Sequence, residues 1–225
     1  MFYEQFLQKE TVTGMIFDVD GTLLDSMPIW AHSGEQYLAT LGIEAPASLG
    51  RVLFSMTMSQ GAEYIKEKFA LSQTAQEIQA GIIHIVEDAY RTKVGFKKSA
   101  LEFLRKLQEA GIPMVIVTSN EEALVREALR RLGAEHYFQE ILTSGGFGSG
   151  KDSPDIFYAA AAQMGSSIGS TWVLEDALYA ISTARKAGFR TIGVADAASR
   201  EDEAQIRGLA DYFIEDYGKI AEEEI

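Results

Sequence analysis

The 225-residue sequence predicts an α/β fold in which a doubly wound parallel sheet is interrupted by an inserted all-α domain. Two observations lead to this prediction. Short apolar runs, each followed by a helical stretch, recur along the chain, and their lack of polar alternation is typical of strands buried on both faces of a parallel sheet. A long stretch after the first of these runs contains helical patterns and no convincing strand.

Five apolar runs are the predicted strands, at 14–17, 113–117, 172–174, 191–194 and 212–214. Helical segments are predicted near 98–110, 121–132, 155–164, 177–187 and 200–209. Because strand and helix alternate, we expect one parallel sheet with helices packed against it.

The stretch 28–94 is predicted to form a separate helical domain. Apolar residues recur at helical spacing in its last segment, at Ile78, Ile82, Ile85 and Ala89. Ser72 is a candidate N-cap for this helix. Because the block follows the first strand directly, we interpret it as a cap over that strand's end. The expected division is therefore an α/β core of 1–27 and 95–225 with a cap of 28–94.

Composition limits the classes of partner and chemistry. The net charge of −13 repels nucleic acid and anionic membranes, so neither is an expected partner. The absence of cysteine excludes disulfides, zinc–thiolate sites and thiol catalysis. Met1 to Thr13 lacks the apolar stretch of a signal peptide, and no apolar run has the length of a membrane span. We expect a cytoplasmic protein that is a monomer or a weak dimer.

Polar residues gather where the predicted strands end, which is where open α/β sheets bind ligands. The groups are Asp18 with Asp20, then Thr118, Ser119 and Asn120, then Lys151 in a loop, and Glu175 with Asp176. Each group alone has an ordinary structural explanation as a turn, a helix cap, a solvated lysine or acids at a helix start. Together they supply a nucleophile, an acid–base group, a hydroxyl, a cation and a second acidic pair. This set indicates phosphoryl transfer, and an acidic protein needs a metal ion to attract a phosphate.

The sequence resembles the haloacid-dehalogenase superfamily of phosphohydrolases over essentially the whole chain. Asp18 to Ser26 matches the first motif of that family, Asp-x-Asp-Gly-Thr-Leu-x-Asp-Ser, without a break. Thr118 matches the second motif, Lys151 with the downstream Pro154-Asp155-Ile156-Phe157 the third, and Glu175-Asp176 the fourth. The resemblance implies a Rossmann-like core.

The resemblance also implies the role of each residue. Asp18 would attack phosphorus and become an aspartyl phosphate, and Asp20 would act as the general acid and base. Magnesium (Mg²⁺) would be held by Asp18, Asp20 through its main-chain carbonyl, Asp176 and Glu175. The phosphate-binding residues would be Thr118, Ser119, Asn120 and Lys151.

The helical insertion is similar to the small cap of the subfamily that contains phosphoglycolate phosphatases and β-phosphoglucomutases. It implies a Mg²⁺-dependent phosphatase whose partner is a small phosphorylated metabolite, a sugar phosphate or a phosphoglycolate-like monoester. A sugar-phosphate mutase is the alternative. The mutases carry a cap histidine about a dozen residues beyond the nucleophile, where this chain has Trp30, with His32 nearby. Asp152, Ala177 and Ala180 also differ from the residues common in the family.

Two further classes remain open. The segment Gly145 to Asp152 nearly matches the P-loop of ATPases and kinases, but Asp152 stands where that motif has a Ser or Thr that binds magnesium. A non-catalytic protein that binds a phosphorylated ligand would also use clustered acids, a hydroxyl and a lysine.

Overall fold

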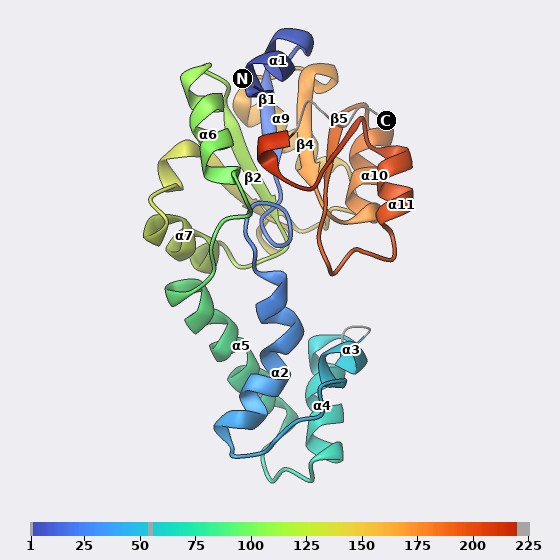
Figure 1. Cartoon of the computed structure of the whole chain (residues 1–225). Coiled ribbons are helices and arrows are strands. Elements are labelled where there is room, and N and C mark those ends of the chain that lie inside the picture. Colours follow the sequence, from blue (N-terminus) through green and yellow to red (C-terminus); the bar gives the residue numbers. More distant parts are fainter. Residues whose placement is uncertain (1, 54–55, 220–225) are drawn as a thin grey trace. The chain divides into compact units, whose positions relative to one another are not determined.

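The structure, a computed structural model, describes residues 2–53 and 56–219 (Figure 1). Within these residues the sheet has six parallel strands in the order β3-β2-β1-β4-β5-β6. They are β1 (Gly14–Phe17), β2 (Met114–Thr118), β3 (Glu140–Thr143), β4 (Thr171–Glu175), β5 (Arg190–Val194) and β6 (Tyr212–Ile214). The chain runs outward from β1 to β3, returns to β4 beside β1, and runs outward again to β6. Because the direction of winding changes between β1 and β4, their carboxyl ends mark the expected ligand crevice.

The predicted α/β fold class is confirmed, and the five predicted strands are present to within one residue at each end. The prediction missed β3. This strand lies at the edge of the sheet, and of its residues only Ile141 is buried. Its sequence, Glu-Ile-Leu-Thr, therefore has no uninterrupted apolar run of the kind that identified the central strands.

Helices cover both faces of the sheet (Figure 1). They are α1 (Phe2–Lys9), α6 (Ala100–Glu109), α7 (Glu122–Arg131), α8 (Ser144–Phe147), α9 (Asp155–Met164), α10 (Leu178–Lys186) and α11 (Glu203–Leu209). Ile16, Val115 and Val173 pack against α9 and α10 on one face. Successive strand residues point to opposite faces, so Phe17 lies on the other, 6.2 Å between ring centroids from Phe103 of α6.

The chain divides into two compact units, one formed by 1–25 with 95–225 and the other by 26–94. The described residues of the second unit form helices α2 (Met27–Thr40), α3 (Leu49–Leu53), α4 (Met58–Lys68) and α5 (Ala75–Thr92), and no strand. The predicted boundaries at 27/28 and 94/95 stay predictions. That this helical unit acts as a cap stays a prediction.

The helical unit has its own hydrophobic core, in which Ile78 and Ile82 of α5 pack with Tyr37 and Leu38 of α2. Gly81 is required at the contact between these helices. A Cβ atom at that position would lie 2.2 Å from the Tyr37 ring, so glycine permits their close approach.

Thr74, and not Ser72, caps the N-terminus of α5. The Thr74 hydroxyl accepts the Glu77 amide at 3.2 Å, and the Glu77 carboxylate accepts the Thr74 amide at 2.7 Å. The Ser72 prediction is wrong because Thr74 has the glutamate three residues later that a reciprocal capping box needs.

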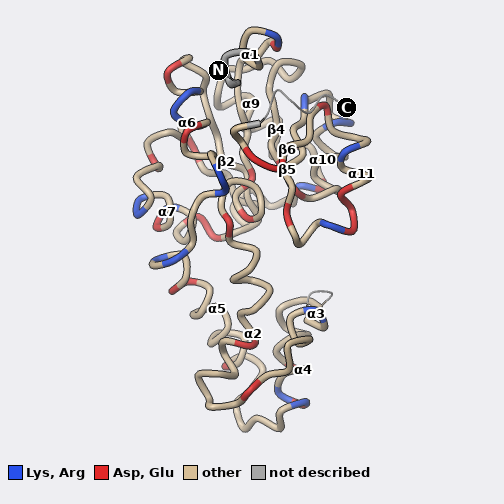
Figure 2. The backbone as a smooth tube through the Cα atoms, viewed as in Figure 1, with Lys and Arg blue, Asp and Glu red and all other residues tan. Residues whose placement is uncertain are grey.

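Charged residues of both signs occur on α6 and α7 (Figure 2). On α7, Arg126 pairs with Glu122 at 2.7 Å, and Arg130 pairs with Glu135 at 2.6 Å. These arginines therefore neutralise neighbouring acids. None of the helices in the described part of the chain is both long and apolar enough to cross a membrane.

Asp211 fastens the edge strand β6 to the start of β5. Its carboxylate accepts the Thr191 amide at 2.8 Å and the Thr191 hydroxyl at 3.2 Å, and it pairs with Arg185 and with Arg190. Burial alone would raise the pKa of Asp211, but these hydrogen bonds and the two arginines lower it. A lowered pKa means that the ionised form stabilises the fold at neutral pH.

We expect Asp211→Asn to lower the free energy of unfolding by about 1–3 kcal/mol at pH 7, because a charged hydrogen-bond acceptor is lost. The deficit should shrink as pH falls below the unfolded-state pKa of about 3.9 and through the lower folded-state pKa, since the wild-type carboxylate is then protonated. Urea denaturation at pH 7 and at low pH measures both. Glu109→Gln, an exposed partner of Lys106, should change stability by under about 0.5 kcal/mol and is the control. A deficit independent of pH would contradict this role.

Candidate active site

The candidate site begins where β1 ends. Asp18 is buried, and its amide donates to the Leu174 carbonyl of β4 at 3.0 Å, which ties the end of β1 to β4. The turn that follows requires Gly21. Its φ of +81° is in the left-handed region, and a Cβ there would lie 2.6 Å from an Asp176 carboxylate oxygen. The Asp-Gly turn therefore brings the first and fourth sequence groups together.

Lys151 is buried between two carboxylates. Its ammonium group donates to Asp18 Oδ1 and, at 2.6 Å, to Glu175 Oε1. Burial disfavours the charged ammonium, but Asp18 and Glu175 outweigh it and raise the pKa of Lys151 above its ordinary value. Lys151 is therefore a fixed positive charge at the end of β1. Lys151 contacts Asp18 and Glu175, so it belongs to this acidic site. It is therefore not placed as the lysine of a phosphate-binding P-loop.

Asp176 follows β4 and is held by Thr22, whose hydroxyl donates to Asp176 Oδ1 at 3.0 Å. Burial, with the negative charges of Glu175, Asp18 and Asp196 nearby, raises the pKa of Asp176 to about 9. Burial likewise raises the pKa of Glu175 to about 6, although Lys151 opposes the shift. The site therefore contains three carboxyl groups and one lysine, so the lysine cannot neutralise all of them.

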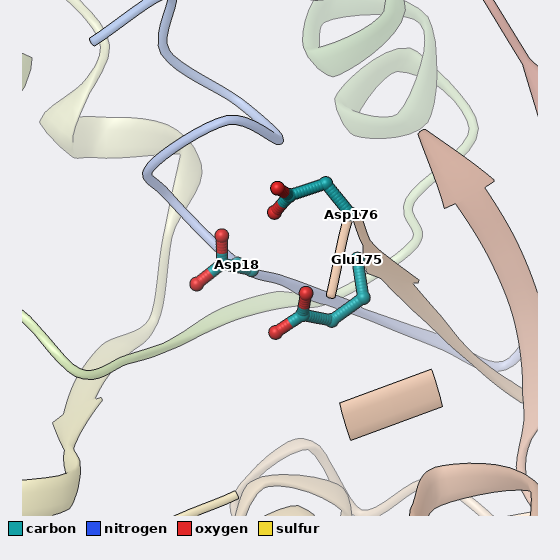
Figure 3. Close-up of side chains that lie close together, drawn as sticks. All are labelled: Asp18, Glu175 and Asp176. Carbon is teal, nitrogen blue, oxygen red and sulfur yellow. The ribbon is translucent and has the colours of Figure 1, made fainter. Parts of the chain in front are cut away.

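Oxygen atoms of Asp18, Glu175 and Asp176 lie within 4.8 Å of one another, and the three carboxylates face the same space at the ends of β1 and β4 (Figure 3). Three carboxylates and one ammonium leave two negative charges if all are ionised (3 − 1 = 2). A divalent cation with a preference for oxygen ligands fits this donor set. Both oxygens of Glu175 already have partners, Lys151 and the Ala177 amide at 2.8 Å, so Asp18 and Asp176 are the better placed ligands.

The second sequence group lies at the end of β2, which pairs with β1. The buried Thr118 hydroxyl accepts the Asn120 amide at 3.0 Å, so its own proton is directed away from that amide. Ser119 is exposed, with its hydroxyl 3.4 Å from that of Ser144. The Asn120 side chain donates to Asp20 Oδ2 at 2.8 Å. Asp20 is half-buried and stands outside the group of three carboxylates.

Several supporting residues escaped the sequence analysis. Thr22 orients Asp176, and the buried Tyr217 hydroxyl in turn donates to the Thr22 carbonyl at 3.1 Å. Asp196, after β5, pairs with Lys97 at 2.7 Å and adds negative charge near Asp176. Tyr179, on the first turn of α10, hydrogen-bonds Ser119. Thr22 lies inside the first motif and could have been singled out. The other contacts join distant parts of the sequence and gave no local signal.

Residues 15–194 match the family model described as haloacid dehalogenase-like hydrolase. Fructose-1-phosphate phosphatase YqaB of Escherichia coli is 28% identical over 82% of this chain and 97% of its own length. Phosphoglycolate phosphatase of Neisseria gonorrhoeae is 26% identical over 82% of this chain and 80% of its own. The crystal structure of CbbY from Rhodobacter sphaeroides with phosphate is 20% identical, with a TM-score of 0.73 over 93% of this chain and 96% of that one.

The chain belongs to the haloacid dehalogenase-like hydrolases, because the family model spans most of its length. This membership confirms the family predicted from the four motifs. A candidate β-phosphoglucomutase of Thermotoga maritima shares the fold at a TM-score of 0.80 and 19% identity, over 92% of this chain and 95% of that one. The predicted enzyme class, a phosphoric monoester hydrolase, agrees with the family and with the names of the two phosphatases.

We expect Mg²⁺ to raise the thermal unfolding temperature of the metal-free protein, because a cation that binds the folded state relieves repulsion among the three carboxylates. Asp176→Asn should move the midpoint of this effect to at least about tenfold higher Mg²⁺ concentration, since one anionic ligand is lost. Differential scanning fluorimetry across a Mg²⁺ titration measures both. Glu109→Gln should leave the midpoint unchanged. Identical titrations for wild type and Asp176→Asn would remove Asp176 from the metal site.

Proposed function

We propose that this enzyme is a Mg²⁺-dependent phosphatase that hydrolyses a small phosphorylated metabolite through an aspartyl phosphate on Asp18. The observation that carries the proposal is the buried contact of Lys151 with Asp18 and Glu175, beside Asp176. A carboxylate, a fixed cation and a second acid meet at the sheet edge where α/β proteins bind ligands. Little else is required of a phosphoryl-transfer site beyond positioning and charge.

The first half-reaction transfers the phosphoryl group to the enzyme. An Asp18 carboxylate oxygen forms a bond to phosphorus while the bond from phosphorus to the ester oxygen breaks. Asp20 gives its proton to that leaving oxygen, so an alcohol departs. Lys151 and the Thr118 hydroxyl bind the phosphoryl oxygens. Asp18 and Asp176 would hold Mg²⁺, which would supply positive charge to balance the phosphate and the acids.

The second half-reaction releases phosphate. Asp20, now a carboxylate, takes a proton from water as the water oxygen attacks phosphorus. The bond between phosphorus and Asp18 breaks, which restores the Asp18 carboxylate and the protonated Asp20. Glu175 holds Lys151 through both steps, and Thr22 holds Asp176.

The substrate we propose is a sugar phosphate or a phosphoglycolate-like monoester. Similarity to fructose-1-phosphate and phosphoglycolate phosphatases supports this class. The mutase alternative is less well supported, because Trp30 stands where the mutases carry a cap histidine. The Trp30 indole donates to the Tyr90 hydroxyl at 3.2 Å, and the nearby His32 pairs with Glu35 at 2.5 Å.

The test of this mechanism separates Asp18 from Asp20. Asp18→Asn removes the nucleophile and should abolish hydrolysis of every ester. Asp20→Asn removes the proton donor, so fructose 1-phosphate, with its basic leaving oxygen, should lose about 10²–10⁴-fold in rate. Nitrophenol should still leave p-nitrophenyl phosphate in a burst, followed by slow turnover. Rapid-quench kinetics measures both steps, and a robustly active Asp18→Asn variant would overturn the mechanism.

We also propose that the helical unit of 26–94 is a cap that selects substrates, since a hinged helical block can close and exclude water. Asp25 donates its amide to the Gly95 carbonyl at 2.9 Å, so the two connections run side by side and a short turn can join them. Replacing 26–94 with a Gly-Ser turn should retain p-nitrophenyl phosphate hydrolysis and abolish discrimination among metabolites. A folded variant, checked by circular dichroism, that kept the wild-type substrate ranking would contradict the cap.

A further inference from the structure

We propose that Asn120 is a positioning residue, which holds the Asp20 carboxyl group through its Oδ2 atom and so orients it for proton transfer. The inference rests on the proposed function, in which Asp20 is the acid and base. It gives Asn120 a role other than the phosphate binding that the resemblance implies.

The contact joins the loops that follow two paired strands. Asn120 Nδ2 donates to Asp20 Oδ2 at 2.8 Å, across 100 residues of sequence. Asp20 follows β1 and Asn120 follows β2, and these strands are parallel neighbours. The bond therefore depends on the register of β1 and β2, whose residues are all buried.

The Asn120 side chain can present only its amino group to Asp20. Its Oδ1 atom accepts the Glu121 amide at 2.8 Å, where α7 begins. The Asn120 amide donates to the Thr118 hydroxyl at 3.0 Å, which fixes the backbone of the same turn. An amide has one accepting and one donating end, so the occupied oxygen forces the donor toward Asp20.

This orientation distinguishes the two oxygens of Asp20. The side-chain amino group of asparagine donates and does not accept, so Oδ2 serves it as an acceptor. The carbonyl oxygen of a protonated carboxyl group is a better acceptor than its hydroxyl oxygen, so this bond favours the proton on Oδ1. The proton that Asp20 transfers is then on Oδ1. In the forward step this proton moves from Oδ1 to the ester oxygen, leaving the carboxylate. In the second step Oδ1 takes a proton from the attacking water, while Asn120 stays bound to Oδ2 throughout.

Kinetics on two esters tests the assignment. Asn120→Ala should slow single-turnover cleavage of fructose 1-phosphate by about 10²-fold, the cost of a misplaced catalytic group. Cleavage of p-nitrophenyl phosphate should change by less than about threefold, because nitrophenolate leaves without a proton. Asn120→Asp, which keeps the size but faces Asp20 with an acceptor, should show the same selective loss. Glu121→Gln, on the adjacent exposed side chain, should leave both rates unchanged and is the matched control.

A double-mutant cycle asks whether Asn120 acts through Asp20. In the Asp20→Ala background, Asn120→Ala should slow fructose 1-phosphate cleavage by less than about twofold further, since the group it positions is gone. Multiplicative losses would assign Asn120 an independent role, such as phosphate binding, and overturn the proposal.

Asn120 is the only asparagine in the chain, so asparagine-selective ¹⁵N labelling gives one side-chain amide pair in the NMR spectrum. The proton bound to Asp20 should resonate downfield of its partner and lose that shift in Asp20→Ala. Asp25→Ala, an exposed acid elsewhere in the same motif, should leave the pair in place. An amide pair unaffected by Asp20→Ala would refute the contact.

Failure of this inference differs from failure of the proposed function. If Asn120→Ala slows both esters equally while wild type and Asp18→Asn behave as a phosphatase and its inactive variant, the positioning role is wrong and the function stands. If wild type cleaves neither ester, the proposed function fails, and with it the catalytic part of this inference. The NMR experiment reports the contact in either case.

Discussion

The buried contact of Lys151 with Asp18 and Glu175 is the interaction on which the candidate site depends. A lysine is rarely buried without a paired charge, because removal of an ammonium group from water is costly. Here two carboxylates keep it charged, and it in turn allows two acids to remain close together. Loss of Lys151 would leave Asp18 and Glu175 buried without their shared cation, and loss of either acid would leave Lys151 with one carboxylate.

The rest of the core supports this group. Parallel pairing of β1 with β4 places Asp18 beside Glu175 and Asp176, and pairing of β1 with β2 places Thr118 and Asn120 on the opposite side. Both flanking strands are buried along their whole length, so their register is set by the hydrophobic core. The polar site is therefore positioned by apolar packing directly beneath it.

Neutral side chains hold Asp176, the third acid of the site. The Tyr217 hydroxyl donates to the Thr22 carbonyl, and the Thr22 hydroxyl donates to Asp176. Tyr217, near the end of the described residues, therefore orients Thr22 of the first motif. Asp196 and its partner Lys97 bring further charge to the same edge. The Thr22 hydrogen bond favours the ionised form of Asp176 and so opposes its repulsion from Glu175, Asp18 and Asp196. A divalent cation would complete the balance of charge.

The sequence alone determined the fold class, the central strands and the four groups of candidate site residues, because each had a local signature. Buried strands read as unbroken apolar runs, and Asp18, Thr118, Lys151 and Asp176 stand where such runs or their loops end. Tertiary structure alone decided the strand β3, whose half-exposed edge position removes the apolar signal, and the cap of α5 at Thr74. It also decided which polar groups meet. The partner of Asn120 is set by the pairing of β1 with β2, because a hydrogen bond across 100 residues leaves no trace in local sequence.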